Sequence, residues 1–440
     1  MSELSRRDFA KLAGAAGASV LAGSSLAPIA YAQGRAKVVI IGGGPGGATV
    51  AHYVKKGAPE LDVTLIEVNR RFTTCFFSNL YLGGFRSFDS ITHSYSNLRK
   101  MGIKIVRDWA TSVDTSKRVV SLRSGKKLSY DKLVVSPGID IKYDSVPGYS
   151  VKVAQTLPHA WQAGPQTQLL KRQLTKMRNG GVVVLAAPPN PYRCPPGPYE
   201  RAAMIAHYLK THKPKSKLIV LDPKKSFSKQ PAFMEAYGKY YKGIIDVRLT
   251  TEIDNFALAR VDPRARMVET KSGEKIKFDV ANIVPAQRAG QIAFKAGLTQ
   301  GDWCPVVPDT FASTKAKDVY VLGDASVATQ MPKSGFSANS QARVVASDIL
   351  AALAKKEKFA PRFRNTCWSL VAPNDSIKVG ASYKPEGGIL KASGGFVSKP
   401  GETAEVRRQN YLESVDWYAG IVTDVFAKSA PAKKPARKKG

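Results

Sequence analysis

The sequence predicts an α/β protein with two dinucleotide-binding-type domains and a C-terminal interface domain. Three observations predict this fold class: a glycine-rich turn between an apolar strand and a helix, a second strand-turn-helix unit in mid-chain, and a later strand that ends in Gly-Asp. A chain of 440 residues exceeds what one core usually organises, and 43% hydrophobic residues can fill two or three cores. We therefore expect several domains.

The first 32 residues have the pattern of a twin-arginine export signal. Arg6 and Arg7 precede a weakly apolar segment rich in Gly and Ala, and the A-x-A site Ala30-Tyr31-Ala32 would release a chain beginning at Gln33. The segment has too few large apolar side chains for a stable membrane span. We expect a periplasmic protein, exported by the twin-arginine route, with no membrane span.

The segment after the leader carries the pattern of a dinucleotide site. An apolar strand ends in G-x-G-x-x-G at Gly42, Gly44 and Gly47, and a helical pattern follows. The first two glycines allow a tight turn that a pyrophosphate can approach, and the third lets helix and strand pack closely. Glu67 ends the next strand, at the spacing of an acid that hydrogen-bonds a ribose hydroxyl. Strand, helix and acid together predict a bound dinucleotide.

A second strand-turn-helix unit has the pattern of a nicotinamide-nucleotide domain. We expect a buried strand at residues 181–187, a helix at 201–210 and a strand at 217–222. The turn at residues 188–198 is rich in proline and has one glycine, so it offers a pyrophosphate few backbone N–H groups. We therefore expect a nicotinamide-type domain, residues 150–284, without a nicotinamide site.

A third segment is expected to return to the first domain. Residues 318–325 form an apolar strand that ends in Gly-Asp, with Asp324 as the acid, and a loop and helix follow. In flavoproteins of the glutathione-reductase type, this Gly-Asp binds the ribityl chain of FAD. Pro137 and Gly138 resemble the same group's motif where the chain leaves the first domain. FAD, rather than NAD, is therefore the expected cofactor. The FAD-binding domain would consist of residues 34–149 and 285–354. An interface domain would follow at residues 355–427, and a basic tail at residues 428–440.

The formal net charge of +33 is unusual. The leader has three basic and two acidic residues and the tail has six basic residues, which leaves +26 on the body. Such charge implies an acidic partner or surface, with steering that salt screens. Periplasmic export argues against nucleic acid, and a basic surface that serves solubility is the alternative. The tail, low in complexity, is expected to be disordered.

Four cysteines remain, and composition alone would allow buried thiols or structural disulfides. The residues around three of them are more specific than the glycine motif. The segments are T-T-C-F-F-S-N at Cys75, R-C-P-P-G-P-Y-E-R at Cys194, N-T-C-W-S at Cys367, and M-P-K-S-G-F-S-A-N-S with Lys333 and Ser337. Together they closely resemble the flavoprotein subunit of flavocytochrome c sulfide dehydrogenase, from about residue 37 to about residue 426.

The resemblance implies a role for each matched residue. The family's FAD is attached covalently, through a thioether, to the cysteine matched by Cys75. The family's redox-active disulfide, set beside the flavin, joins the cysteines matched by Cys194 and Cys367. Glu200 stands at the place of a proposed proton-transfer acid, and an acid stabilised by the helix dipole is the alternative.

Other residues have simpler expectations. Lys333 and Ser337, in the fourth matched segment, are assigned to the cofactor site. Cys304 lies outside the cysteine motifs and is expected to be a buried, inert thiol. No metal is expected, because the histidines have no metal-ligand spacing: His52, His93, His159, His207 and His212.

The implied activity is periplasmic oxidation of sulfide. Hydrosulfide would open the disulfide by thiol-disulfide exchange, and FAD would pass on two electrons one at a time. Because the sequence has no C-x-x-C-H haem motif, the expected acceptor is a separate c-type cytochrome subunit in a heterodimer.

Three alternatives stay open. A sulfide:quinone oxidoreductase shares the fold and the disulfide but usually has amphipathic C-terminal helices; residues 410–426 are one short candidate, which we interpret as a packing helix of the interface domain. An NADH-dependent disulfide reductase would need glycines at residues 188–198. A non-enzymatic electron-relay or assembly protein would not need Cys194 and Cys367 to bond.

Overall fold

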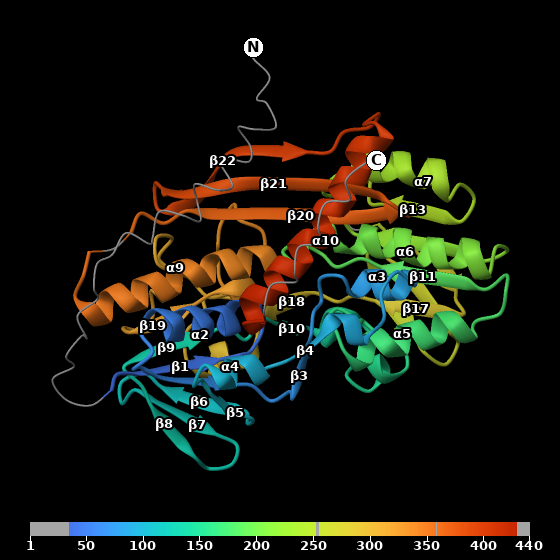
Figure 1. The fold of residues 1–440 in the computed structure, drawn as a ribbon. Helices are drawn as coiled ribbons and strands as arrows, with labels where there is room; N and C mark the ends of the chain where they lie inside the picture. Colours follow the sequence, from blue (N-terminus) through green and yellow to red (C-terminus); the bar gives the residue numbers. More distant parts are fainter. Residues whose placement is uncertain (1–34, 252–254, 358, 429–440) are drawn as a thin grey trace, which may run out of the picture. The chain divides into compact units, whose positions relative to one another are not determined.

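The computed structural model describes residues 35–251, 255–357 and 359–428 (Figure 1). The expected export signal and residues 429–440 of the expected tail lie outside them. Lys428 is described: its Nζ lies 2.9 Å from Nδ1 of His93, so the first residue assigned to a disordered tail packs against the body.

The glycine motif lies at the end of a parallel sheet with strand order β19-β9-β1-β2-β5. The last four residues of β1 are buried, because helices and a small sheet cover the two faces of the parallel sheet. Strand β19 pairs in parallel with β9, so the strand before Gly-Asp returns to the sheet of the glycine motif. The bounds are β1 Lys37–Ile41, β2 Asp62–Ile66, β5 Lys104–Val106, β9 Lys132–Val135 and β19 Val319–Val321.

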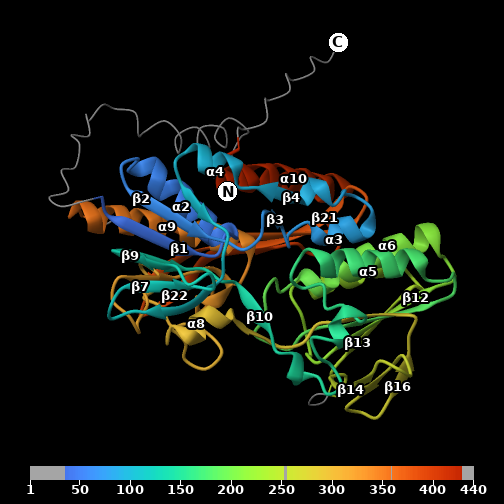
Figure 2. The same cartoon turned by 90° about the horizontal axis from the view of Figure 1, so that it is seen from below.

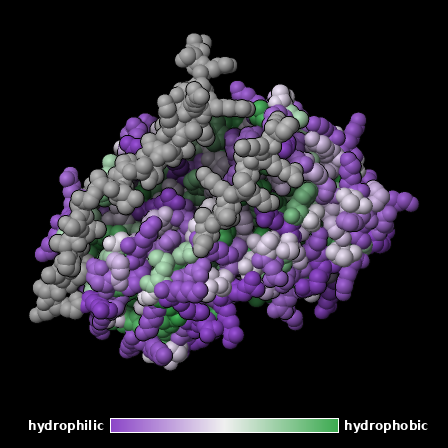
Figure 3. All heavy atoms as spheres, viewed as in Figure 1, coloured by the Kyte–Doolittle hydropathy of each residue, from purple (hydrophilic) through white to green (hydrophobic). Residues whose placement is uncertain are grey.

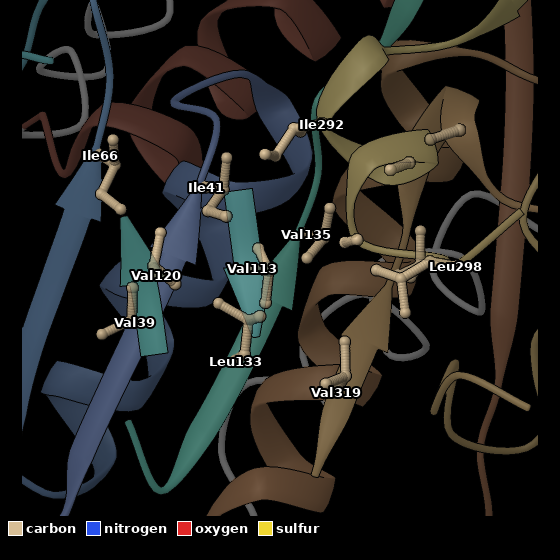
Figure 4. Close-up of a cluster of buried hydrophobic side chains, with 14 of the residues drawn as sticks. Val39, Ile41, Ile66, Val113, Val120, Leu133, Val135, Ile292, Leu298 and Val319 are labelled. Atoms are coloured by element: carbon tan, nitrogen blue, oxygen red, sulfur yellow. The ribbon is translucent and has the colours of Figure 1, made fainter. Parts of the chain in front are cut away.

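The core of this unit lies between the parallel sheet and a small antiparallel sheet, β6-β7-β8 (Figure 4). Val39, Leu133 and Val319 from the parallel strands pack with Val113 and Val120 from the antiparallel sheet. Helices α2 and α9 pack together as part of the same unit (Figure 2). The bounds are α2 Pro45–Gly57, α9 Gly335–Ala354, α8 Gln291–Lys295, β6 Ala110–Asp114, β7 Val119–Leu122 and β8 Lys127–Ser129.

The second unit is a parallel sheet with order β13-β12-β11-β17, beside an antiparallel sheet β14-β15-β16. The expected strand at residues 217–222 is β12, and the helix expected at residues 201–210 begins earlier, at Gly197, where Pro198 suits the first turn. The bounds are β11 Val182–Ala186, β12 Lys217–Asp222, β13 Ile245–Leu249, β14 Leu258–Asp262, β15 Met267–Thr270, β16 Lys275–Lys277, β17 Val280–Ile283, α5 Pro165–Lys176, α6 Gly197–His212 and α7 Gln230–Tyr240.

Two short ladders connect these units to the rest of the chain. Strands β10 and β18 pair antiparallel, so the chain leaves the first unit and returns to it along the same ladder. Strands β3 and β4 form a second pair, on either side of α3 in the sequence. The bounds are β3 Arg71–Thr73, β4 Thr92–Ser94, β10 Ile139–Ile141, β18 Gln287–Ala289, α3 Ser78–Gly83, α4 Ser96–Lys100, η1 Asp89–Ile91, η2 Tyr143–Ser145, η3 Val153–Gln155 and η4 Gly323–Ala325.

The C-terminal region contains an antiparallel sheet that the sequence did not predict. Its strands are β20 Phe363–Ala372, β21 Asp375–Glu386 and β22 Ile389–Val397, in that order. The helix expected at residues 410–426 is longer, α10 Ala404–Phe426, capped by Thr403 and packed against β21 and α2. A search of the described helices for one long and apolar enough to cross a membrane finds none.

Candidate flavin and disulfide site

The glycine turn of the first unit is shaped by close backbone contacts. Gly42 has φ +98°, and a Cβ there would lie 2.2 Å from the carbonyl oxygen of Ser136. A Cβ on Gly47 would lie 2.0 Å from the carbonyl oxygen of Gly42. Gly44, at the N-cap of α2, makes no side-chain cap hydrogen bond, so first-turn N–H groups remain for an anion. This cradle fits a pyrophosphate.

Glu67 accepts hydrogen bonds from the chain itself that the sequence did not predict. Its Oε2 accepts the backbone N–H of Gly43 at 2.9 Å, and its Oε1 accepts the backbone N–H of Asn69 at 2.7 Å. The buried carboxylate therefore fixes the glycine turn itself. A carboxylate oxygen can accept a second hydrogen bond, so Oε2 keeps capacity for a ribose hydroxyl.

Asp324, in η4, lies in the same unit as the glycine turn. Its Oδ2 is 3.4 Å from Nη1 of Arg193, whereas its buried Oδ1 has no hydrogen-bond partner among the described residues. The buried Nε2 of Gln287 also has none within that part of the chain. Buried polar atoms are nearly always paired, so an unpaired acceptor and an unpaired donor fit a hydroxylated ligand such as FAD.

The other expected cofactor residues have mixed roles. Lys333 donates from Nζ to the carbonyl oxygens of Asp324, at 2.9 Å, and Ser326, at 2.7 Å, and burial lowers its pKa to about 8. Ser337 donates its backbone N–H to Ser334 Oγ, the N-cap of α9, so it belongs to a helix cap. Gly138, after Pro137, has φ +68° and accepts the N–H of Gly290. The structure thus gives these residues structural partners, and their cofactor contacts stay predictions.

Cys75 lies between β3 and α3 and is partly exposed. Its carbonyl oxygen accepts the N–H of Ser78, and Phe77 has φ +68°, which turns the chain into α3. The Phe76 ring lies against Gly335, the first residue of α9. The segment therefore holds Cys75 near the N-terminus of α9.

Cys194 lies on the proline-rich turn between β11 and α6, in the left-handed region with φ +60°. Its N–H donates to the carbonyl oxygen of Lys333 at 2.8 Å, and the N–H of Arg193 donates to Gln287 Oε1 at 2.9 Å. With the Arg193 contact to Asp324, these bonds fasten the turn of the second unit to the first unit.

Cys367 lies in β20, far from Cys194 in the sequence. Its Sγ lies 3.5 Å from Nδ2 of Asn365. Burial raises the pKa of Cys194, and the charges of Cys367, Glu200 and Cys75 raise it further. Glu200 bonds Leu370, three residues after Cys367, and Asn79, four residues after Cys75, so the fold brings these segments together. Cys194 and Cys367 are unbonded in this structure, and their disulfide stays a prediction.

Glu200 lies in the first turn of α6, partly buried, and interacts with Cys194 and Cys367. It accepts hydrogen bonds from Asn79 Nδ2 at 2.8 Å and from the N–H of Leu370 at 3.0 Å. Burial raises the pKa of Glu200, whereas these bonds oppose the rise. The carboxyl therefore keeps its proton to a higher pH than an exposed glutamate, which suits a group that holds or releases a proton.

Two cations beside the cysteines were not identified from the sequence. Arg193 precedes Cys194 and belongs to its quoted motif, so the motif itself was a signal for it. Lys229, which precedes α7, donates from Nζ to the carbonyl oxygen of Cys367 at 3.0 Å. A lysine in a lysine-rich segment carries no signal of its own, and only the fold brings it to the site.

The acid at the end of β12 is bonded within the chain, and the expected absence of a nicotinamide site stays a prediction. The buried carboxylate of Asp222 accepts the Tyr199 hydroxyl at 2.6 Å and pairs with Lys224 Nζ at 2.6 Å. The Phe227 ring stacks on Tyr199 with 3.6 Å between ring centroids. The acid at the strand end is thus already bonded and covered by aromatic rings.

Cys304 is fully buried in the core of the first unit, as expected, and burial raises its pKa to about 12. Its inertness stays a prediction. A search of the described residues finds no group of three or more His, Cys, Asp or Glu that could hold a metal ion. The histidines instead contact neighbouring groups, such as His52, whose Nδ1 lies 2.6 Å from the carbonyl oxygen of Asp424.

Fold and site together define a class, the FAD-dependent oxidoreductases with two dinucleotide-binding units. The family model for pyridine nucleotide-disulphide oxidoreductases matches residues 36–184. The model for the central part of the sulfide dehydrogenase (flavocytochrome c) flavoprotein chain matches residues 167–285, and the model for the flavin-binding part of flavocytochrome c sulphide dehydrogenase matches residues 359–426.

Individual relatives agree with these matches. A sulfide dehydrogenase (flavocytochrome c) flavoprotein chain from Chlorobaculum thiosulfatiphilum is 50% identical over 46 residues, which cover 10% of this chain and 96% of that sequence. The sulfide-quinone reductase of Aquifex aeolicus is 25% identical over 356 residues, 75% of this chain and 80% of the relative. The chain therefore belongs to the flavocytochrome c sulfide dehydrogenase flavoprotein family, a family of sulfide-oxidising flavoproteins.

The fold has a solved counterpart. The X-ray structure of the sulfide:quinone oxidoreductase from Aquifex aeolicus superposes with a TM-score of 0.68 at 20% identity and covers 90% of this chain and 93% of that chain. The fold class and the family expected from the sequence are confirmed.

Proposed function

We propose that this protein oxidises sulfide in the periplasm through a Cys194–Cys367 disulfide and covalent FAD, and passes single electrons to a c-type cytochrome subunit. One observation carries the proposal. The cysteine of the proline-rich turn and the cysteine of β20 are partly buried beside Glu200, which bonds the N–H of Leu370 in β20, and Arg193 joins the turn to Asp324. Remote segments thus bring two thiols and an acid to the FAD unit.

The chain's own groups suit thiol-disulfide chemistry. Hydrosulfide would attack one sulfur of the pair, giving a persulfide on one cysteine and a thiolate on the other. The N–H of Cys194 is held by Lys333, so the turn that carries this sulfur is fixed. Glu200 holds a proton within the buried cluster. Bound FAD would supply a two-electron acceptor that can release electrons one at a time.

Cys75 is the proposed attachment point of FAD. It is partly exposed, on a segment ordered by hydrogen bonds, and Asn79 of the same segment donates from Nδ2 to Glu200 Oε2 at 2.8 Å. The attachment residue and the disulfide thus lie at one site, although they come from different units.

A cytochrome acceptor is supported by two further observations. Aromatic rings extend from the Cys75 segment to α10: the Phe76 and Trp417 centroids are 5.4 Å apart, as are those of Trp417 and Trp368. Hydrophilic residues cover much of the described surface in Figure 3, and the body carries a large positive charge. Such a surface favours an acidic partner, in keeping with an exported protein and its cytochrome subunit.

A direct comparison of acceptors tests the proposal. The purified full-length protein is given sulfide with either an acidic c-type cytochrome or a soluble quinone analogue, and reduction of each acceptor is followed spectroscopically. We expect rapid sulfide-dependent cytochrome reduction that Cys194→Ser abolishes and Cys304→Ser retains. Quinone reduction without cytochrome reduction would instead favour the quinone-type activity of the Aquifex aeolicus relative.

A further inference from the structure

Lys229 is a buried cation next to Cys367, and the proposed chemistry does not yet use it. It lies in the left-handed region, with φ +62°, just before α7, and its residue is 5% exposed. Its Nζ donates to the carbonyl oxygen of Cys367 at 3.0 Å, to Ser369 Oγ at 2.8 Å and to the carbonyl oxygen of Ile377 at 3.3 Å. The ammonium is therefore fixed on β20 and β21.

All three of these acceptors are neutral. A lysine ammonium has three N–H donors, so its hydrogen bonds are complete, while no carboxylate of the described residues bonds it. The acid that interacts with it, Glu200, is buried, and burial raises the pKa of Glu200 and favours its neutral form. The ammonium of Lys229 therefore places a positive charge beside Cys367.

The charges on the two sides of the cysteine pair differ. On the Cys194 side, Arg193 pairs with Asp324, and the buried guanidinium of Arg201, which also interacts with Cys194, donates to the side-chain oxygens of Asn79 and Asn282. On the Cys367 side, burial raises the pKa of the thiol, and the hydrogen bond from Asn365 and then the charge of Lys229 oppose that rise. A thiolate is therefore favoured more at Cys367 than at Cys194.

Burial lowers the pKa of Lys229 to about 8, so the ammonium is mostly charged at neutral pH. The other titratable groups that interact with Cys367 or Lys229 come from the surrounding elements: Cys194 on the proline-rich turn, Glu200 on α6, Tyr383 on β21 and Arg407 on α10.

We propose that Lys229 stabilises the thiolate of Cys367 and thereby directs hydrosulfide onto Cys194. The inference rests on the proposed function. A bond forms between the hydrosulfide sulfur and Cys194 Sγ while the Sγ–Sγ bond breaks. The electron pair of the broken bond stays on Cys367, the proton stays on the incoming sulfur, and the charge is conserved.

The reduced full-length protein tests the thiolate directly. It is alkylated with iodoacetamide across the neutral and mildly alkaline range, and modification of the Cys367 peptide is followed by mass spectrometry. Lys229→Met should lower the alkylation rate of Cys367 at neutral pH about tenfold, which corresponds to a rise of about one pKa unit. Lys229→Arg, which keeps the charge, should stay near the wild-type rate.

Lys171→Met is the matched control, because its half-buried ammonium also donates to a carbonyl oxygen, that of Leu82, at 2.8 Å, away from the cysteines. It should leave the pH profile unchanged. A Cys367 profile that is unaltered in Lys229→Met, or shifted equally in Lys171→Met, would overturn the proposal.

A second measurement identifies the sulfur that receives the substrate. The oxidised protein is exposed briefly to sulfide, quenched with an alkylating agent and mapped for persulfide. We expect persulfide on Cys194 in the wild type and on both cysteines in Lys229→Met; wild-type persulfide on Cys367 would contradict the inference. If Cys194 and Cys367 are free thiols in the oxidised protein, the proposed function is refuted instead. The alkylation profile of the reduced protein would still decide the role of Lys229.

Discussion

The backbone N–H of Leu370 donates a hydrogen bond to Glu200 Oε1 at 3.0 Å. This bond joins α6, which follows Cys194, to β20, which carries Cys367. A partly buried acid thereby links the strand that carries Cys367 to the helix that follows the turn of Cys194. Its other oxygen accepts from Asn79, four residues after Cys75, so the same carboxylate also contacts the segment that carries Cys75.

Glu200→Gln should change the pH dependence of stability in a defined direction. Burial raises the folded-state pKa of Glu200, so the folded state binds this proton more tightly than the unfolded state does. The stability from this group is complete below the unfolded-state pKa and is lost as pH rises through the folded-state pKa. The unfolding free energy, measured by denaturant titration, should therefore fall less with rising pH in Glu200→Gln than in the wild type. A parallel decline in both proteins would contradict a raised pKa.

The same variant should alter catalysis. Glutamine keeps an oxygen for the Leu370 N–H but cannot exchange a proton, so turnover should fall and one limb of the pH-rate profile should disappear. Steady-state cytochrome reduction over a pH series measures this. An unchanged profile would leave Glu200 with only the linking role.

Cys194→Ser and Cys367→Ser should each abolish sulfide-dependent cytochrome reduction. The two thiols act as one unit, so the double variant should be no worse than either single variant. Cys304→Ser is the control, because that thiol is fully buried in another core and should retain most activity. Substantial turnover by either single variant would exclude the proposed disulfide chemistry.

Cys75→Ala should release the flavin. In the wild type, flavin fluorescence should migrate with the polypeptide on a denaturing gel, whereas acid precipitation of Cys75→Ala should leave flavin in the supernatant. Some FAD should still bind the folded variant through the glycine cradle. If acid also extracts flavin from the wild type, the attachment is not covalent.

Gly47→Ala and Gly44→Ala separate folding from cofactor binding. A Cβ on Gly47 would lie 2.0 Å from a backbone oxygen, so this variant should lower the melting temperature and flavin content together. A Cβ on Gly44 would meet only the Phe72 ring, at 3.5 Å, so the protein should fold normally. Flavin content should nevertheless fall, since Gly44 stands where a pyrophosphate would approach. Normal flavin loading of Gly44→Ala would mean that the pyrophosphate lies elsewhere.

Local patterns predicted the parts of the fold that depend on neighbouring residues. The glycine turn, β12 and the strand before Asp324 lie where expected, because strand periodicity and turn glycines are short-range signals. The sheet of β20, β21 and β22 was missed. Its residues are largely exposed along β22, so the alternating pattern of a half-buried strand is weak there.

The candidate site divides in the same way, into residues predicted from local sequence and residues that only tertiary packing brings together. Its cysteines were identified from their sequence contexts, whereas Lys229 was missed because only the packing of α7 on β20 brings it to Cys367. Glu67 was expected to hydrogen-bond a ribose hydroxyl, and the structure shows that it accepts the N–H of Gly43, which depends on how β2 ends beside the turn. Partners of this kind are set by tertiary contacts.

The last prediction concerns the positive charge of the body. If that charge serves the docking of an acidic cytochrome, the association rate should fall steeply as salt reduces the Debye length from about 10 Å to about 3 Å. Reduction of the flavin by sulfide alone should change little, because in the proposed reaction hydrosulfide meets the cysteines inside the protein, where salt screens charges less. Stopped-flow mixing with and without cytochrome separates the two steps.

Deleting residues 429–440 is the matched control for that experiment. The deletion removes five basic residues and leaves Lys428 against His93, while the body keeps +26. Its effect on the association rate should therefore be modest. An association rate indifferent to ionic strength would mean that the basic surface serves solubility or the cell envelope. The cytochrome would then be held by apolar contacts, for which the partly exposed rings of Trp368 and Trp417 are the first residues to substitute.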